Sequence, residues 1–248
     1  MPSLSSPLPW PSSSSAAFAL PFAAPLLSLR FPLALALAAT GPAAPAPLLL
    51  PGASGPQIAA WDGKEISALV VGGRGDRVER VRLARAPGWD QEALSLRPSG
   101  VGSAEVPAEH EVVALVPGLR VGPVTGLGPA PGALMAGESH RLTTTAEGAW
   151  LLRVDEAMGL SIELHALDEA GMPERAAAQR QVLGGADDPT RPPSVEWIGD
   201  VDGDGAPDLV IELNPTLGGP RKRRLLTGGA AAEGELLGVL AEGDAGGC

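Results

Sequence analysis

The chain has 248 residues, of which 18 are Lys or Arg and 29 are Asp or Glu, so its formal charge is -11. This acidic balance argues against a nucleic-acid-binding protein, because phosphate recognition depends on a dense surface of Lys and Arg. One cysteine, Cys248, excludes an internal disulfide and a thiolate zinc site, and three histidines are few for a catalytic zinc centre.

The charge is distributed unevenly along the chain. Residues 1–61 contain no Asp, Glu, Lys or His and a single arginine, Arg30. All 29 acidic residues and 17 of the basic residues therefore lie in residues 62–248. The first 18 residues are rich in Pro and Ser and cannot bury enough apolar surface to offset their ordering entropy, so we expect them to be disordered.

Residues 26–46 have the order of a secretory signal peptide. Arg30 supplies the positive charge, Phe31–Ala39 is an apolar run, and the small residues of Ala44–Ala46 follow. The apolar run is too short to span a bilayer. We therefore predict a disordered start and signal peptide within residues 1–46, export to the periplasm or the extracellular space, and no transmembrane span in the mature chain. A low-complexity tail without a targeting role is the alternative.

After an expected linker at residues 47–61, the pattern changes to that of a β protein. Short runs rich in Val and Leu recur, bounded by Gly, Pro or Asp, which predicts an all-β, antiparallel sandwich-like domain over residues 62–248. The predicted strands are Ile66–Val71, Val78–Ala84, Ala93–Leu96, Glu111–Val116, Trp150–Val154, Leu160–Leu167, Val195–Ile198, Leu209–Leu213 and Arg224–Leu226.

Three further stretches bear on the organisation of this domain. Residues 117–132 contain nine Gly or Pro in sixteen positions, a density that breaks regular structure. They either join two subdomains or form a long loop across one sandwich. Pro173–Leu183 and Ala230–Ala241 are rich in alanine and are candidates for helices, although neither shows an apolar stripe.

Residues 160–167 show the alternation of a strand most clearly. The apolar residues share one face, which we interpret as a wall of the core. The polar residues Ser161, Glu163 and His165 share the other face. Because no nucleophile or glycine-rich pocket accompanies Glu163 and His165, we interpret this face as hydrated rather than as a general acid–base site.

The strongest functional signal is the segment Gly-Asp-Val-Asp-Gly-Asp-Gly-Ala-Pro-Asp-Leu-Val-Ile at residues 199–211. With Asp200 as position one, carboxylates fall at positions one, three, five and nine, and glycine falls at position six. Hard cations such as Ca²⁺ take several oxygen ligands from a tightly curved loop, in which glycine permits the sharp turn. The predicted Ca²⁺ ligands are the carboxylates of Asp200, Asp202, Asp204 and Asp208 and the backbone carbonyl of Ala206.

This loop differs from an EF-hand loop. Position twelve is Ile211 instead of the bidentate Glu, and the flanking sequence is strand-like. Glu212 would then point off the other face of the following strand. We therefore predict a β-loop-β calcium site. A polar hairpin turn is the alternative, because Asp and Gly are common turn formers.

Residues 199–211 resemble the calcium loop of FG-GAP/VCBS-type repeats, whose pattern is Asp-x-Asp-x-Asp-Gly-x-x-Asp followed by a hydrophobic strand. The resemblance implies a Ca²⁺ ion held between two strands. The C-terminal part of the chain is also similar to a group of uncharacterised exported bacterial proteins that carry one such loop near the C-terminus. The similar features are Trp197, the strand at Arg224–Leu226, Glu235–Leu237 and the terminal Gly-Cys. Only one copy is present in this chain, which disfavours a complete β-propeller.

Two charged motifs have ordinary structural interpretations. The integrin-type tripeptide Arg74–Asp76 lies between two predicted strands, so we interpret it as a hairpin turn. The basic residues Arg221–Arg224 could bind an anionic surface. We interpret them instead as a solvated strand edge that discourages pairing between sheets.

The sequence thus predicts an exported, calcium-binding β-domain protein without catalytic activity, used in binding, adhesion or the cell envelope, in which Ca²⁺ is mainly structural. Its predicted partners are the calcium ion and a cell-envelope or carbohydrate ligand. The alternative is an extracellular hydrolase or carbohydrate-binding accessory that uses Trp150 or Trp197. Because the chain contains few Phe residues and no Tyr, we expect its tryptophans, including Trp61 and Trp89, to anchor the core instead.

Overall fold

The computed structural model describes ten segments of the chain. They are residues 44–51, 60–73, 75–85, 94–98, 110–143, 149–155, 160–167, 180–186, 191–214 and 219–245. For residues 85, 94–98, 110, 143 and 186 the structure describes the backbone alone. All the described residues belong to one compact unit, Gly41–Cys248.

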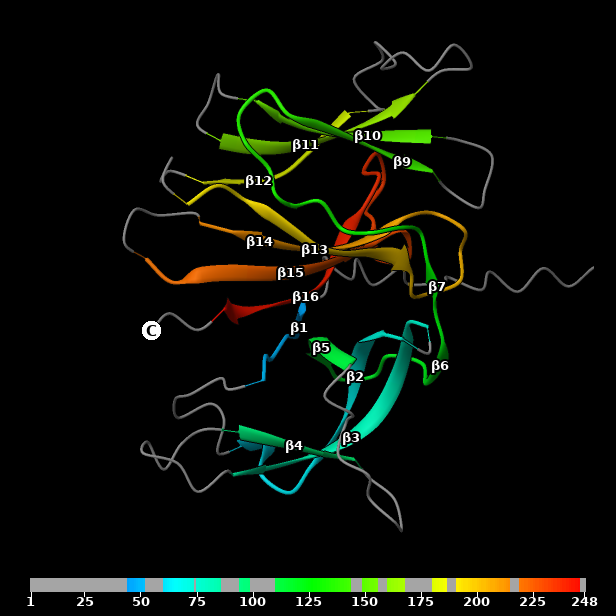
Figure 1. Ribbon diagram of the computed structural model, residues 1–248, viewed down its shortest axis with the longest axis vertical. Coiled ribbons are helices and arrows are strands. Elements are labelled where there is room, and N and C mark those ends of the chain that lie inside the picture. Colours follow the sequence, from blue (N-terminus) through cyan, green and yellow to red (C-terminus); the bar gives the residue numbers. More distant parts are fainter. Residues whose placement is uncertain are drawn as a thin grey trace, which may run out of the picture. The chain divides into compact units, whose positions relative to one another are not determined.

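The fold is all β, as the sequence predicts, and its strands form three sheets (Figure 1). The central sheet has the order β1-β16-β15-β14-β13-β7, and β8 also pairs with β13. Every neighbouring pair is antiparallel except β1 and β16. Its strands are β1 (Ala46–Pro47), β7 (Thr125–Gly126), β8 (Gly132–Ala133), β13 (Ser194–Asp200), β14 (Asp208–Leu213), β15 (Arg221–Thr227) and β16 (Gly238–Ala245).

The other two sheets are antiparallel and pair strands that are close in sequence. The β9–β12 sheet has the order β12-β11-β10-β9, and the β2–β6 sheet has the order β4-β3-β2-β5, with β6 paired to β3. Their strands are β9 (Ser139–Thr143), β10 (Ala149–Asp155), β11 (Leu160–Leu167), β12 (Arg180–Ala186), β2 (Glu65–Gly72), β3 (Arg77–Arg85), β4 (Leu94–Pro98), β5 (His110–Val116) and β6 (Gly122–Pro123).

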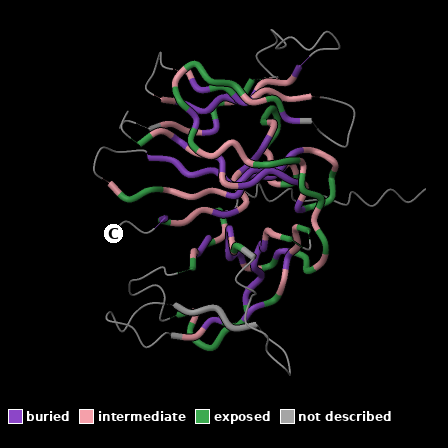
Figure 2. Tube along the Cα trace, in the orientation of Figure 1, coloured by how far each residue is buried: buried purple, intermediate pink, exposed green. Residues whose placement is uncertain are grey.

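The central sheet is buried on both faces. One face packs on the β9–β12 sheet, where Leu209 and Ile211 of β14 join a cluster with Leu152 and Ile162. The opposite face packs on the β2–β6 sheet, where Val210 joins a second cluster that includes β2 and β5 residues. Every residue of β14 is consequently buried (Figure 2). Two stacked pairs of sheets therefore share one middle layer, an extension of the sandwich arrangement.

A β-bulge in β13 lets this strand contribute to both clusters. Val195 pairs with Ile211 and Trp197 pairs with Val210, so Glu196 is the extra residue. The bulge shifts the side-chain alternation by one position. Val195 therefore joins the cluster on the β9–β12 side, and Trp197 joins the cluster on the β2–β6 side.

The segment around β1 joins two sheets, although residues 47–61 were expected to form a linker. Leu48 N donates to Glu242 O of β16, and Leu49 exchanges backbone hydrogen bonds with Leu115 of β5. Both leucines are buried, at 2% and 7% exposure. Gly243 permits the close approach, because a Cβ there would lie 1.8 Å from Leu48 O. The first residues of the expected linker are therefore part of the core.

The Gly/Pro-rich stretch at residues 117–132 runs from one sheet to another. It leaves β5, pairs with β3 through β6, and then pairs with β13 through β7 and β8. It is therefore a second connection between the β2–β6 sheet and the central sheet.

The prediction of a helix at Ala230–Ala241 is wrong. A single 3-10 turn, η3 (Gly228–Ala230), is followed by irregular backbone and then by β16. Gly238 pairs with Thr227, and a Cβ on Gly238 would lie 1.9 Å from Ala230 O. Tertiary packing against β15 therefore overrides the helical preference of the alanines. Of the other helix candidate, residues 180–183 belong to β12, and the rest lies outside the described residues.

The basic residues of β15 are not at a sheet edge, because β15 lies between β14 and β16. Arg223 Nη1 donates to Val113 O of the β2–β6 sheet at 3.1 Å. Arg224 Nη1 donates to Leu183 O of the β9–β12 sheet at 3.2 Å. Neighbouring side chains on a strand point to opposite faces. The two arginines therefore tie the central sheet to both of its neighbours.

The polar face of β11 is not hydrated, contrary to the sequence interpretation. Glu163 is 4% exposed and Ser161 is 9% exposed. The carboxylate of Glu163 contacts His165 Nε2 at 2.9 Å and forms an ion pair with Arg180 of β12. Glu163 is therefore a buried residue with two charged or polar partners.

Glu212 is a buried carboxylate on β14 that is neutralised within the central sheet. It is 6% exposed, and it accepts from Arg221 Nη1 at 2.6 Å and from Arg223 Nη2 at 2.8 Å. Burial alone would raise the pKa of Glu212, but the hydrogen bonds and charges of Arg223 and Arg221 together hold this pKa below its ordinary value.

We predict that Glu212→Gln lowers the free energy of unfolding by roughly 1.5–3 kcal/mol near pH 7, because charge-assisted hydrogen bonds are lost. The folded pKa is depressed, so the stabilisation is complete above the unfolded pKa of about 4.5 and is lost as the pH falls through the folded pKa. Urea unfolding of both proteins between about pH 3 and pH 7 measures the difference.

The difference between wild type and Glu212→Gln should therefore shrink below about pH 4. An equal difference at about pH 3 and pH 7 would contradict the ion-pair account. Glu65→Gln is the control, because Glu65 pairs with Arg82 on an exposed surface and should change stability by at most about 0.5 kcal/mol.

Candidate metal centre

The predicted calcium loop connects β13 to β14. Asp200 is the last residue of β13, Asp208 is the first residue of β14, and Gly199 pairs with Asp208 across the hairpin. Both flanking strands lie inside the central sheet. The loop therefore has the β-loop-β geometry that the sequence predicts, and its two ends are held by buried strands.

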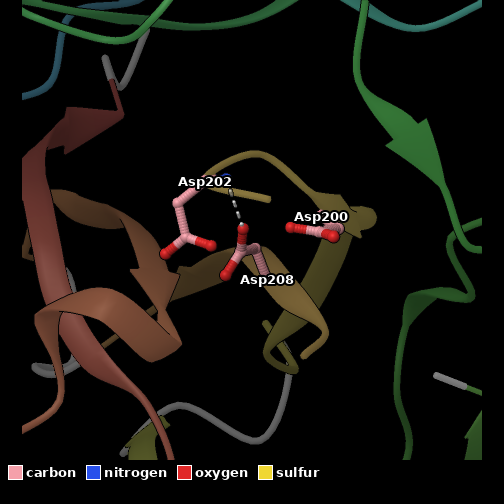
Figure 3. Close-up of side chains that lie close together, drawn as sticks. All are labelled: Asp200, Asp202 and Asp208. Carbon is pink, nitrogen blue, oxygen red and sulfur yellow. Dashed lines mark hydrogen bonds between the residues drawn. The ribbon is translucent and has the colours of Figure 1, made fainter. Parts of the chain in front are cut away.

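Three of the four predicted carboxylates come together. Asp200, Asp202 and Asp208 each offer an oxygen, and these oxygens all lie within 4.8 Å of one another. In Figure 3 the carboxylate of Asp208 lies between those of Asp202 and Asp200. Asp204 is outside this group. The carbonyl of Ala206 remains a predicted ligand.

Two glycines give the loop its curvature. Gly203 and Gly205 have φ angles of +82° and +83°, in the left-handed region that other residues rarely adopt. Gly205 is the position-six glycine that the sequence assigned to the sharp turn. These two turns keep Asp200 near Asp208 although seven residues separate them.

Asp208 is the buried anchor of the loop, with no exposed surface. Its Oδ2 accepts from Val201 N at 2.6 Å and from Asp202 N at 3.3 Å, and its Oδ1 accepts from Gly228 N at 3.3 Å. These bonds hold both the start of the loop and the turn after β15 against one carboxylate.

The other carboxylates also accept backbone N–H groups of the loop. Asp200 accepts from Gly203 at 2.6 Å and from Gly205 at 3.1 Å. Asp202 accepts from Asp204 N at 3.2 Å. Each carboxylate oxygen that accepts one such bond retains a lone pair. The hydrogen bonds therefore orient the side chains without using all their capacity as ligands.

Asp204 is oriented differently from the other three. Its Oδ1 accepts from Ala206 N at 2.7 Å, a local turn within the loop. Its Oδ2 approaches the turn after β15, because a Cβ on Gly228 would lie 2.2 Å from that atom. Asp204 is exposed, unlike the anchor Asp208, so its carboxylate can rotate with less disruption than that of Asp208.

A second segment contributes to the site and was missed by the sequence interpretation. Gly229 N donates to Asp202 Oδ2 at 3.0 Å, and a Cβ on Gly229 would lie 2.7 Å from the same oxygen. Thr227 is buried and accepts from Ala230 N at 3.2 Å, which fixes the turn η3. A Gly-Gly pair in sequence indicates only a turn. Its role here comes from the pairing of β14 with β15.

Two carboxylates of the loop, Asp208 and Asp204, have raised pKa values. Burial raises the pKa of Asp208 to about 7, and the charges of Asp202 and Asp204 act in the same direction, against the hydrogen bond from Val201 N. Partial desolvation of its carboxylate also raises the pKa of Asp204, although the residue as a whole is exposed; the charges of Asp202 and Asp200 add to the effect and the bond from Ala206 N opposes it.

This cluster lacks a compensating cation among the described residues. No Lys or Arg within the described segments forms an ion pair with Asp200, Asp202, Asp204 or Asp208. The donor set consists of carboxylate oxygens, which suit hard cations such as Ca²⁺. A bound divalent cation would offset both the desolvation and the smaller mutual repulsion that raise the pKa values of Asp208 and Asp204.

The tryptophans occupy core positions in the described part of the chain. Trp197 is 3% exposed, Trp150 packs against the cluster on the β9–β12 side, and Trp61 packs against a cluster of the β2–β6 sheet. Trp89 lies outside the described residues. Because Trp197 is buried, its ring cannot form a carbohydrate-binding surface. The ring of Trp150 is partly covered by the core.

The third residue of the Arg-Gly-Asp motif has a structural role. Asp76 Oδ2 accepts from Trp197 Nε1 at 2.8 Å, which engages this carboxylate in a contact with the central sheet. Arg74 lies outside the described residues. The hydrogen bond agrees with the interpretation of this segment as structural rather than adhesive.

Comparison with protein family models, with curated proteins and with solved structures gives no significant match. Within the described segments, no helix has the length and apolar character needed to cross a bilayer.

We predict that Asp208→Ala lowers the free energy of unfolding by roughly 2 kcal/mol in buffer containing EDTA, because buried N–H groups lose their acceptor. Near pH 6, below the pKa of about 7, the Asp208 carboxyl is mostly neutral, so its removal relieves little buried charge. Urea unfolding measures the change.

Asp204→Ala is the matched control, since Asp204 belongs to the same loop but is exposed. It should change stability by at most about 0.5 kcal/mol. Equal effects of the two substitutions would contradict the assignment of Asp208 as the anchor of the loop.

Proposed function

We propose that this protein is an exported, non-catalytic β-domain protein that binds one Ca²⁺ ion in the loop Asp200–Asp208. The observation that carries the proposal is the convergence of three carboxylates, from Asp200, Asp202 and Asp208, to within 4.8 Å. The likeness of residues 199–211 to FG-GAP/VCBS-type calcium loops supports the same ion. Asp204 and the carbonyl of Ala206 would complete the oxygen ligands.

A mainly structural role for the ion is supported by the position of the loop. The ligands lie at the ends of two neighbouring strands of the central sheet, and Gly228 and Gly229 N–H groups bind two of the same carboxylates. An ion at this point would hold the β13–β14 hairpin to the turn after β15. Binding to the folded state alone stabilises that state by mass action.

A binding, adhesion or cell-envelope role fits this proposal, with a cell-envelope or carbohydrate ligand as the partner class. A nonspecific acidic surface is a poorer account of the loop, because Asp208 is fully buried and its pKa is raised to about 7. Burying a carboxylate is unfavourable unless a cation or hydrogen bonds compensate its charge.

Calcium should raise the melting temperature of the protein. At a free Ca²⁺ concentration of about one hundred times Kd, the stabilisation is about 2.7 kcal/mol, or roughly 5–10 °C for a domain of this size. Asp202→Ala should remove this shift, because it deletes one of the converging carboxylates. Calorimetric melts with Ca²⁺ and with EDTA measure it.

Asp244→Ala is the charge-matched control for this melt, because Asp244 forms an ion pair with Lys222 away from the loop. It should retain the full calcium shift. If EDTA and Ca²⁺ give the same wild-type melting temperature, the proposed calcium site is wrong.

Export rests on the sequence of residues 26–46, of which residues 26–43 lie outside the described segments. Arg30, the apolar run Phe31–Ala39 and the small residues that follow have the order of a signal peptide. Export also suits a structural calcium site, because Ca²⁺ is plentiful outside the cytoplasm.

N-terminal sequencing of exported material should give a first residue between Ala39 and Pro47. The upper bound follows from Leu48 and Leu49, whose buried side chains are part of the core. The same measurement on the cytoplasmic fraction gives the comparison. An intact Met1 on all of the protein, confined to the cytoplasm, would refute export.

A further inference from the structure

A hydrogen bond beside the loop links the central sheet to the β2–β6 sheet. Trp197 lies three residues before Asp200 on β13, and its Nε1 donates to Asp76 Oδ2 at 2.8 Å. Asp76 directly precedes β3 of the β2–β6 sheet. The strand that supplies the first predicted calcium ligand therefore also supplies a polar contact between the two sheets.

The short strand β7 makes a second link to the same aspartate. Thr125 of β7 pairs with Asp200, and Gly126 pairs with Gly199. Val124 N, one residue before β7, donates to Asp76 O at 3.0 Å. Asp76 is thus connected to β13 through its side chain and, by way of β7, through its backbone.

Gly126 and Gly199 allow the groups around Asp76 and Trp197 to pack closely. A Cβ on Gly126 would lie 2.8 Å from Asp76 Oδ2. A Cβ on Gly199 would lie 2.1 Å from the ring of Trp197 and 2.7 Å from Thr125 O. Close-packed contacts of this kind transmit displacements, because neighbouring groups have no free volume in which to relax.

We propose that calcium occupancy of the loop and docking of the β2–β6 sheet on the central sheet are coupled through the contacts of Trp197, Asp76 and Thr125. A bound calcium ion then stabilises the packing of the two sheets as well as the β13–β14 hairpin. This inference rests on the calcium site proposed above.

Thermodynamic linkage gives the coupling a measurable form. If calcium favours the docked arrangement by some factor, the docked arrangement must favour calcium binding by that same factor, typically about fivefold or more. Weakening the Trp197–Asp76 contact disfavours docking and should therefore weaken calcium binding. Other contacts between the sheets remain in such a variant, among them Arg223 Nη1 to Val113 O and the pairing of Leu49 with Leu115. The variant should therefore stay folded.

Gly126→Ala tests the coupling without changing any charge. Its Cβ must displace the carboxylate of Asp76, a flexible side-chain end, and its backbone is not in the left-handed region. Gly73→Ala is the matched control, because a Cβ there meets nothing within 4 Å. Titration calorimetry of the full chain with Ca²⁺ should give binding about fivefold or more weaker for Gly126→Ala than for Gly73→Ala.

A second pair of variants removes the acceptor itself. Asp76→Ala and Glu65→Ala each remove one negative charge from the β2–β6 sheet, but only Asp76 contacts Trp197. Asp76→Ala should again bind Ca²⁺ about fivefold or more weakly than its control. In the wild type, calcium should slow amide hydrogen exchange at Arg77–Glu79, outside the ion loop.

Two outcomes separate this inference from the calcium site. Binding within about twofold of the controls for both Gly126→Ala and Asp76→Ala, with unchanged exchange at Arg77–Glu79 in the wild type, would overturn the coupling while leaving the site in place. A wild-type chain that gives no heat with Ca²⁺ would overturn the site and the coupling together.

Discussion

Burial of β14 on both faces is the constraint on which the rest of the structure depends. The strand has hydrophobic clusters on its two sides, yet it carries two carboxylates, Asp208 and Glu212, both less than 9% exposed. A buried carboxylate requires hydrogen bonds and a compensating charge. Arg221 and Arg223 of the neighbouring strand compensate Glu212. Asp208 accepts hydrogen bonds from backbone donors but, in the described segments, has no arginine or lysine partner. The proposed Ca²⁺ would supply the positive charge that compensates this carboxylate.

The all-β class and the main strands could be predicted because short apolar runs bounded by turn residues depend only on local sequence. The three-layer arrangement could not, because it depends on contacts between distant strands. Arg223 and Arg224 illustrate this difference. Four basic residues in a row suggest a solvated edge, but pairing of β15 with β14 and β16 places Arg223 and Arg224 between sheets, where each donates to a carbonyl of a different neighbouring sheet. The predicted helix at residues 230–241 failed for the same reason.

The calcium loop was the most predictable part of the candidate site, because its ligands and its turn glycines are contiguous in sequence. The placement of Asp200 and Asp208 at the facing ends of two strands follows from the strand-like flanks. The Gly228–Gly229 turn could not be found in this way, since it reaches the loop only through the register of β15. Trp197 and Asp76, which form a hydrogen bond, are 121 positions apart in the chain, and no local sequence pattern indicates this contact.

The proposed binding of one divalent cation among these carboxylates can be observed by anomalous diffraction from crystals soaked in Ca²⁺ or Tb³⁺. We expect a single strong peak among the carboxylates of Asp200, Asp202 and Asp208, with Ca²⁺–oxygen distances of about 2.3–2.6 Å. Well-ordered loop density without a peak at saturating ion, or ions bound only elsewhere on the surface, would contradict it.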